Sequence, residues 1–463
     1  MDRRDFLKAA VAAALTPAFL SWTAAAESSR ARPNILIAVA DDLGYGDLAC
    51  YGHRTIKTPN IDRLATQGIK LTDYYSPAPL CSPARAGFLT GRNPYRCGIY
   101  DWIPDNWPVY LRREEITFAT LLKGVGYDTC QIGKWHLNGK MGSPEQPQPN
   151  DHGFDYWFST LHNAEPNHHN PENFYRNGKP VGGIEGYASD ICVAETIDWL
   201  KNKWDRSQPF CIFLCFHEPH KNIATDPEII KQHYSDERLQ YQYEISPAEY
   251  FGNVTQMDRA YGRLLKTLDD MKLTDETFTM FTSDNGPDPT GTVFGSAGEM
   301  RRGKAYIYEG GIRVPCLIRW PGRIQPGTVS EEPSSGMDLM PTLCEMAGAQ
   351  VPGDRTIDGV SMLPMFAGQR ITREIPMYFR WNGCWSSMQV AMRDGDWKLL
   401  ADGDLQEFEM YNLRADPREL HNAAGLRPMA KFEELKEKLV KLHEGVKADM
   451  PKNWHWGPPP DEE

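Results

Sequence analysis

The sequence predicts an α/β protein: a mostly parallel sheet flanked by helices, followed by a smaller C-terminal α+β domain built on an antiparallel sheet. From Asn34 onward, short apolar runs alternate with longer helix-like segments, a pattern typical of parallel strands joined by helices. After about Gly368 the pattern changes to alternating runs separated by Asp-Gly, a strong hairpin signal. With 463 residues the chain also exceeds the size at which one core stops growing, so two domains are expected.

The expected elements follow from these patterns. The strands of the first domain are five apolar runs: Ile35–Ala40, Thr129–Ile132, Phe210–Phe216, Phe278–Thr282 and Cys316–Trp320. The expected helices are Pro59–Gly68, Thr117–Gly124, Ala188–Lys201, Gly252–Met271 and Met340–Ala347. The second domain is expected to contain a hairpin, Met388–Arg393 with Trp397–Leu400, and a closing amphipathic helix, Lys431–Val446. We therefore place the catalytic domain at 27–368, the C-terminal subdomain at 369–456 and a disordered tail at 457–463.

The first 26 residues have the order of regions found in an export signal. Arg3 and Arg4 open a basic segment, an apolar run extends from Ala9 to Leu20, and small residues at Ala24–Ala26 provide a cleavage site. This order predicts a twin-arginine signal peptide, with the twin-arginine export machinery as a partner and a periplasmic or secreted location. No later run is long and apolar enough to predict a membrane span.

Composition and charge narrow the class of partner. The formal net charge of −12 makes nucleic acid and anionic membranes poor partners, so an anionic substrate must be bound by a local basic pocket. The ten cysteines include no Cys-x-x-Cys pair that would predict a zinc site. Several of them lie in apolar runs, where burial as free thiols is expected more than disulfide bonding.

The segment Cys81-Ser82-Pro83-Ala84-Arg85 stands out as a candidate catalytic motif. Ser82 and Pro83 predict the start of a helix, with a side-chain cap followed by a proline. Cys81 would then lie at a helix N-terminus, where free N–H groups favour an anion. Arg85 in the first turn is disfavoured by the helix dipole unless an anion binds beside it. The alternative interpretation is a capped helix with an ordinary buried cysteine.

Two pairs of oxygen-bearing residues each follow a predicted strand. Asp41-Asp42 come after Ile35–Ala40, and Asp284-Asn285 come just after Phe278–Thr282. Ligands of α/β sheets collect at the carboxyl ends of strands, so the two pairs are expected to meet. Three carboxylates and an amide suit Ca²⁺ or Mg²⁺ and suit zinc poorly. Either pair alone could be a turn or a helix cap; together they favour a metal site.

Basic side chains follow other predicted strands in the same way. Lys134 and His136 come after the strand that ends at Ile132, and His217 and His220 come after the strand that ends at Phe216. Lys304 follows the second acidic pair. Lone histidines and lysines in loops are usually only solvated, but here several are expected on the side of the sheet where the acidic pairs lie.

The ordered motifs resemble those of the sulfatases, a family in the alkaline-phosphatase-like superfamily, over most of residues 33–400. The resemblance is carried by Pro33–Leu36 with Asp41–Asp47, by Cys81–Arg85, by Gly133–His136, by Asp284–Gly286 and by Gly303-Lys304 through Pro315. Within the family, the resemblance is to the arylsulfatases and the N-acetylgalactosamine-6-sulfatases. The choice between His217 and His220 is left to the family's Pro-His pattern, which points to His220.

The resemblance implies a fold, a modification and a mechanism. Cys81 would be oxidised to formylglycine by a formylglycine-generating enzyme, and the aldehyde hydrate would attack sulfur to give a covalent enzyme sulfate. One divalent ion, Ca²⁺ with Mg²⁺ as the alternative, would be bound by Asp41, Asp42, Cys81, Asp284 and Asn285. Arg85, Lys134, His220 and Lys304 would neutralise the sulfate. His220 or Lys304 would protonate the leaving oxygen, and His136 would help release the sulfate.

Two rival functions remain: a formylglycine-dependent phosphodiesterase or phosphonate hydrolase, and a non-catalytic protein that binds sulfated glycans. For the substrate, the resemblance implies a sulfated sugar, galactose or N-acetylgalactosamine sulfate, attacked by exo action. Four tryptophans near the motifs could stack on sugar rings, although buried aromatics are more often core residues: Trp102, Trp107, Trp135 and Trp157.

Overall fold

The structure is a computed structural model that describes residues 32–240, 245–426, 429–452 and 456. The chain divides into two compact units, Met1–Arg32 and Pro33–Glu463, and the description below concerns the second. The predicted signal peptide (1–26) and the predicted tail (457–463) lie outside the described residues. No helix in the described part of the chain has the length and apolar character needed to span a membrane.

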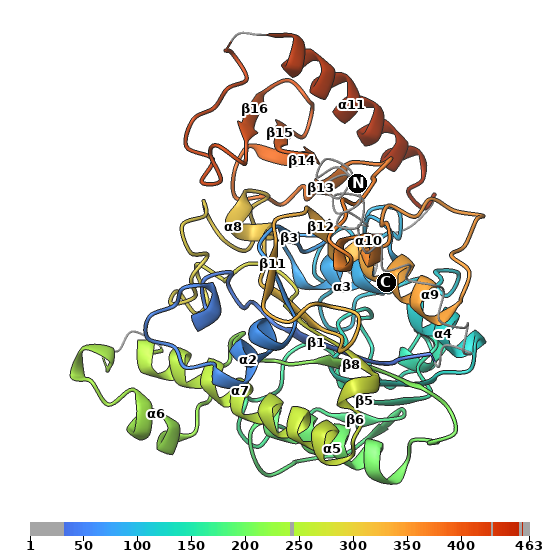
Figure 1. Ribbon diagram of the computed structural model, residues 1–463, viewed down its shortest axis with the longest axis vertical. Coiled ribbons are helices and arrows are strands. Elements are labelled where there is room, and N and C mark those ends of the chain that lie inside the picture. Colours follow the sequence, from blue (N-terminus) through green and yellow to red (C-terminus); the bar gives the residue numbers. More distant parts are fainter. Residues whose placement is uncertain (1–31, 241–244, 427–428, 453–455, 457–463) are drawn as a thin grey trace, which may run out of the picture. The chain divides into compact units, whose positions relative to one another are not determined.

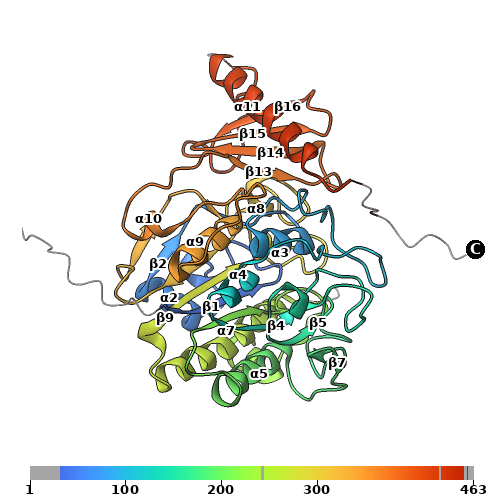
Figure 2. The same ribbon diagram turned by 90° about the vertical axis from the view of Figure 1, so that its right-hand side faces the viewer.

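The sequence-predicted α/β class is confirmed by a large mixed sheet (Figures 1 and 2). Its strands lie in the order β11-β2-β10-β9-β1-β8-β4-β5-β6-β7. The five central strands are parallel to one another: β9 (Thr277–Ser283), β1 (Asn34–Ala40), β8 (Phe210–Cys215), β4 (Asp128–Lys134) and β5 (Tyr156–Thr160). The outer strands are β11 (Thr328–Ser330), β2 (Ile69–Leu71), β10 (Cys316–Arg319), β6 (Tyr175–Arg176) and β7 (Lys179–Pro180).

Helices cover both faces of this sheet because the side chains of its strands alternate between two cores. Ile35, Ile37 and Val39 of β1 lie in a cluster that includes residues of α3 (Cys81–Thr90), α4 (Phe118–Gly124) and α9 (Leu339–Ala347). Leu36, Ala38 and Ala40 belong to a second cluster with α2 (Pro59–Gln67), α5 (Ala188–Asn202) and α7 (Pro247–Asp270). A strand buried on both faces reads as a continuous apolar run, which is why the sequence revealed it.

A four-stranded antiparallel sheet forms the C-terminal part, as predicted. Its strands are β13 (Met377–Arg380), β14 (Met388–Asp394), β15 (Trp397–Asp402) and β16 (Phe408–Asn412), in that spatial order. The predicted turn lies at Gly395-Asp396, and the φ of +59° at Gly395 explains why glycine is needed there. α11 (Met429–Ala448) covers one face through Phe432, Leu435 and Leu439. The exact domain boundaries stay a prediction.

Short elements complete the fold. They are the strands β3 (Tyr74–Tyr75) and β12 (Ser334–Ser335), which pair with each other, and the helices α6 (Pro227–His233), α8 (Glu309–Ile312) and α10 (Leu363–Phe366). The largest error in a predicted boundary is at α7, which begins at Pro247, not at Gly252; the other predicted ends agree with the structure or differ by one or two residues. Ser246 and Glu249 form a capping box around Pro247, a start signal that the sequence contained.

Candidate active site

The predicted site residues meet at the carboxyl edge of the central strands. Asp41 and Asp42 follow β1, and Asp284 follows β9, whose Ser283 is in register with Ala40. Lys134 is the last residue of β4. Because these strands are parallel and adjacent through β8, their ends deliver acidic and basic groups to one place.

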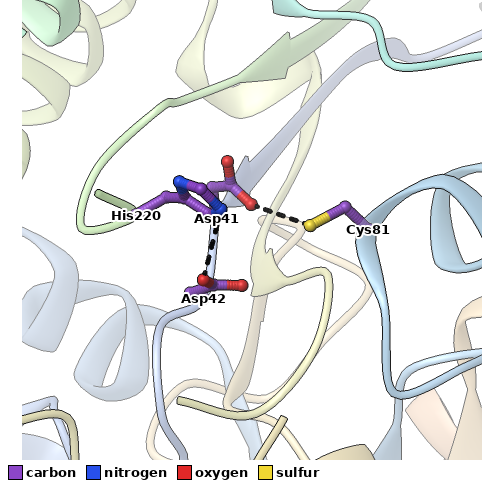
Figure 3. Close-up of side chains that lie close together, drawn as sticks. All are labelled: Asp41, Asp42, Cys81 and His220. Carbon is purple, nitrogen blue, oxygen red and sulfur yellow. Dashed lines mark hydrogen bonds and ion pairs between the residues drawn. The ribbon is translucent and has the colours of Figure 1, made fainter. Parts of the chain in front are cut away.

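Cys81 reaches this place from helix α3 (Figure 3). It is the first residue of the helix and only 3% exposed. The thiol donates to Oδ1 of Asp41 at 3.4 Å. Nζ of Lys304 lies 3.5 Å from the sulfur. The predicted side-chain cap was wrong: the N-cap is Leu80, without a capping bond, and Oγ of Ser82 instead accepts the Ile103 N–H.

Three buried carboxylates pair one to one with three cations. Nζ of Lys134 lies 2.6 Å from Asp41, and an Arg85 guanidinium nitrogen lies 2.8 Å from Asp284. Nζ of Lys304 contacts both oxygens of Asp42, at 2.7 and 2.8 Å. The formal charges of these six side chains therefore cancel. Such pairing offsets the cost of burying each charge, which would otherwise be several kcal/mol.

The pKa values reflect burial and these neighbours. Burial raises the pKa of Asp42 to about 7, against the attraction of Lys304. Burial alone would raise the pKa of Asp41, but Lys134, His220 and Arg85 together hold this pKa well below the usual range. Burial raises the pKa of the Cys81 thiol. An unmodified Cys81 is therefore a poor thiolate nucleophile, since nucleophilic cysteines have lowered pKa values.

The histidines take different positions. Nε2 of His220 lies 3.6 Å from Asp42, and Nε2 of His136 contacts the Ile103 carbonyl at 3.1 Å (Figure 3 shows His220). Among the residues that the structure describes, Nδ1 of His136 is buried without a hydrogen-bond partner. Nε2 of His217 instead contacts the Thr160 hydroxyl at 2.8 Å. Of the two histidines that the sequence left open, the structure brings His220 into the acidic cluster.

A cavity of about 480 Å³ opens onto this cluster. Cys81, His136, His220 and Lys304 line it, whereas Arg85 and Lys134, each 1% exposed, are not among its lining residues. Arg85 and Lys134 are therefore connected to the cavity through the carboxylates of Asp284 and Asp41, which they contact. Further lining residues had no motif that would reveal them: Asp101, His162, Asn163, Lys221, Asp288, Thr290, Trp381 and Trp385.

Of the four predicted sugar-stacking tryptophans, Trp102 alone lines the cavity. Trp135 and Trp157 are 1% and 2% exposed and belong to the hydrophobic core between the sheet and α4, and Trp107 packs against the same core. For these three the structure supports the alternative of core aromatics. A tryptophan in a motif block is usually needed to fill space around the strands.

The cluster fits a divalent cation. Ligand atoms of Asp41, Asp42, Cys81 and His220 lie within 4.8 Å of one another. Asn285 directs Nδ2 to Asp42 at 2.7 Å, while its Oδ1 is buried with no hydrogen-bond partner in the described part of the chain. An unpartnered buried oxygen is costly and is expected to have a ligand. Carboxylate and amide oxygens are the ligands that Ca²⁺ and Mg²⁺ prefer.

Comparisons with known proteins agree with this geometry. The family model described as Sulfatase matches residues 33–349, and the model described as N-sulphoglucosamine sulphohydrolase, C-terminal, matches residues 299–445. The chain is 34% identical to the steryl-sulfatase of Rattus norvegicus, over 73% of this chain and 70% of that protein. It is 34% identical to the N-acetylgalactosamine-6-sulfatase of Homo sapiens, over 75% and 68%.

A solved structure extends the similarity to the whole fold. The crystal structure of Ps i-CgsB in complex with k-i-k-neocarrahexaose superposes with a TM-score of 0.80 at 27% sequence identity. The match covers 91% of this chain and 94% of that chain, so it includes both the large sheet and most of the C-terminal part.

Proposed function

This chain belongs to the sulfatase family of sulfuric ester hydrolases, and we propose that it removes sulfate from galacto-configured sugars, using a formylglycine made from Cys81 and a bound divalent cation. The observation that carries the proposal is the position of Cys81. Its sulfur lies 3.4 Å from Asp41 and 3.5 Å from Lys304, at the wall of a cavity large enough for a small ligand.

The proposed nucleophile requires Cys81 to be oxidised by a formylglycine-generating enzyme. The thiol itself is buried and has a raised pKa, so it is ill suited to attack sulfur. A hydrated aldehyde at the same position offers two hydroxyls, one for attack and a second for release of the product. A serine or an unmodified cysteine lacks the second hydroxyl.

The residues that would hold the cation are Asp41, Asp42, Asp284, Asn285 and the modified Cys81. We favour Ca²⁺, with Mg²⁺ as the alternative, because the site offers several carboxylate oxygens and an amide oxygen. The bound ion would polarise a sulfate oxygen as a Lewis acid. The unpartnered Oδ1 of Asn285 is the observation in this chain that supports the ligand set.

The remaining steps fall to side chains of this chain. Lys304 and His220 border the cavity, so either is placed to stabilise the sulfate oxygens and to protonate the departing sugar oxygen. Lys304 holds its proton more firmly: burial opposes its charge, but Asp42 raises the pKa of the amine well above its usual range, whereas burial lowers the pKa of His220 well below its ordinary value. Arg85 and Lys134 hold Asp284 and Asp41 in place and add positive potential from behind.

His136 is the base that we assign to product release. With Nε2–H donated to the Ile103 carbonyl, its Nδ1 is left as a free acceptor. Burial lowers the pKa of His136 well below the ordinary value, which keeps the ring neutral and able to accept a proton. His136 lines the cavity together with Cys81, so it can take the proton of the second hydroxyl.

A sugar substrate is supported by two of the similar proteins. One is named N-acetylgalactosamine-6-sulfatase, and another was solved in complex with k-i-k-neocarrahexaose. Export to the periplasm or the medium through the twin-arginine machinery is supported by Arg3, Arg4 and the apolar run that follows them. These residues precede Pro33, where the family match begins.

The test is sulfate release from a panel of 2-, 3-, 4- and 6-O-sulfated galactose and glucose, and of 3-, 4- and 6-O-sulfated N-acetylgalactosamine and N-acetylglucosamine. The protein is co-expressed with a formylglycine-generating enzyme, and peptide mass analysis verifies the aldehyde at position 81. We expect release from galacto-configured sugars and none with Cys81→Ala. Selective release from gluco-configured sugars would contradict the substrate.

The same preparation tests the two rivals. Faster turnover of an aryl phosphodiester than of the matched aryl sulfate would favour the phosphodiesterase or phosphonate hydrolase. An unmodified Cys81 in the presence of the modifying enzyme, with sulfated glycan bound but not hydrolysed, would favour a binding protein.

A further inference from the structure

The wall of the active-site cavity carries two tryptophans that are unusually exposed. Trp102 is 50% exposed and Trp385 is 51% exposed, and within the described residues they are the tryptophans with large exposed surfaces. Both line the cavity that contains Cys81. An indole left half in water beside a catalytic cavity provides a flat apolar face for a ligand.

The backbone next to Trp102 is fixed to the catalytic residues. The Trp102 N–H donates to the Asp101 carboxylate at 2.8 Å. The next residue, Ile103, donates its N–H to Oγ of Ser82 at 3.1 Å, and its carbonyl contacts Nε2 of His136 at 3.1 Å. The position of Trp102 is therefore tied to the neighbour of Cys81 and to the proposed base.

Trp385 is tied to another part of the site. It lies in the segment between β13 and β14, and its N–H donates to the carbonyl of Ala305, next to Lys304, at 3.3 Å. Its ring meets that of Tyr306 edge to face, with centroids 5.9 Å apart. The C-terminal sheet thus contributes a stacking surface whose position is coupled to that of a catalytic lysine.

Polar groups complete the wall between the aromatic faces. Asn163, Lys221, Thr290 and the carboxylates of Asp101 and Asp288 line the same cavity. A sugar ring presents C–H bonds on its faces and hydroxyls on its edges, so it matches both kinds of group. A sterol would cover these polar groups without pairing them, which costs free energy.

We propose that Trp102 and Trp385 are specificity-determining residues that stack on the sugar carrying the scissile sulfate, and that they select a sugar over a sterol. The inference rests on the proposed sulfatase reaction and adds the residues that choose its substrate. A galacto-configured ring suits such a wall, because its axial 4-hydroxyl leaves one ring face lined by C–H bonds. The cavity of about 480 Å³ has room for one or two sugar rings.

The experiment compares Trp102→Ala and Trp385→Ala with the unchanged protein on the best sulfated sugar of the panel. Each variant is expected to raise KM about tenfold, equal to about 1.4 kcal/mol. The value of kcat should change little, because stacking contributes alike to the ground state and the transition state. Trp204→Ala is the matched control: Trp204 is partly exposed and does not line the cavity, so KM should not change.

Several outcomes would overturn the inference. They are an unchanged KM in both variants, a fall in kcat alone, or a higher kcat/KM for a steryl sulfate than for every sugar sulfate. A separate measurement distinguishes a failure of the proposed stacking from a failure of the proposed reaction. It is an intrinsic fluorescence titration of the Cys81→Ala protein with the panel sugars. Saturable sugar binding that both tryptophan substitutions weaken supports the proposed stacking even without turnover. The absence of saturable binding overturns it.

Discussion

The contact between Lys304 and Asp42 predicts that the lysine and a divalent cation compete for one carboxylate. Nζ of Lys304 contacts both oxygens of Asp42, at 2.7 and 2.8 Å. Nδ2 of Asn285 also donates to this carboxylate, at 2.7 Å, and Nε2 of His220 lies 3.6 Å from it. Lys304→Met keeps the length of the apolar stem but removes the charge, so Asp42 would lose its cationic partner.

The contacts give the size of the effect. A hydrogen bond to a charged group contributes about 1.5–3 kcal/mol, and the Lys304 side chain is 13% exposed, so we take the lower part, about 1.5–2 kcal/mol. In Lys304→Met a cation need not displace the ammonium group, so its binding free energy becomes more favourable by this amount. The gain corresponds to binding about 10- to 30-fold tighter. Sulfate release should fall by about 10²- to 10³-fold, because a charge that stabilises the transition state is lost.

The assay is calcium titration calorimetry on chelator-stripped protein, comparing the unchanged chain, Lys304→Met and the charge-retaining control Lys304→Arg. We expect the arginine variant to bind calcium about as weakly as the unchanged chain does. Equal calcium affinity in the unchanged and methionine proteins would refute the competition. Calcium binding to none of the three would refute the metal site itself.

Three further predictions concern the scaffold. Gly133→Ala should lower the free energy of unfolding, measured in urea, by roughly 2–5 kcal/mol, because φ is +90° and the new Cβ would lie 1.9 Å from a β8 carbonyl oxygen. Gly348→Ala is the control: φ is +72° but the space around it is open, so only the backbone strain should remain, about 1–2 kcal/mol. Burial lowers the pKa of His152 to about 4, so its neutral form stabilises the fold above pH 6.5 and this contribution is lost as the pH falls toward 4. His152→Gln should therefore remove about 2–3 kcal/mol of the acid dependence between pH 7 and 4.5, which unfolding at both pH values would show. Lys398→Met should lower stability by about 3–5 kcal/mol, because the buried Glu419 would lose the lysine 2.9 Å away, whereas Glu309 would keep Arg313; an unchanged thermal transition would contradict this.

The parts of the fold that sequence could predict are those buried on both faces. β1 and β8 are seven and six residues long, every residue in them is buried, and apolar residues dominate both, so each has the run typical of a strand covered on two faces. β9 is also buried along all seven residues, but its apolar Phe278, Met280 and Phe281 lie among threonines, so its signal is weaker. The edge strands β6 and β7 have two residues each and are partly or fully exposed, so they carry no such signal. Their pairing is decided by the chain around them and not by their own composition.

The candidate site shows a similar division. Asp41, Lys134 and Asp284 could be predicted because each lies at or just after the end of a central strand, where the topology of the sheet brings them together. Trp385 could not, because it lies in a segment between two strands of another sheet and reaches the cavity through tertiary packing. Residues that choose a substrate depend on such contacts, for which a single sequence contains no periodic pattern.

The balance of charge connects this scaffold to the proposed reaction. The pairs Arg85–Asp284, Lys134–Asp41 and Lys304–Asp42 leave the cluster neutral in formal charge. A divalent cation would raise it to about +2, whereas a sulfate ester brings only one negative charge. Attack by an ionised hydroxyl at position 81 would add the second, so the site matches the charge of the transition state better than that of the bound substrate. The ion pairs offset the cost of burying the charged groups in the folded protein. The bound cation would then add the positive charge that stabilises the transition state of sulfate transfer.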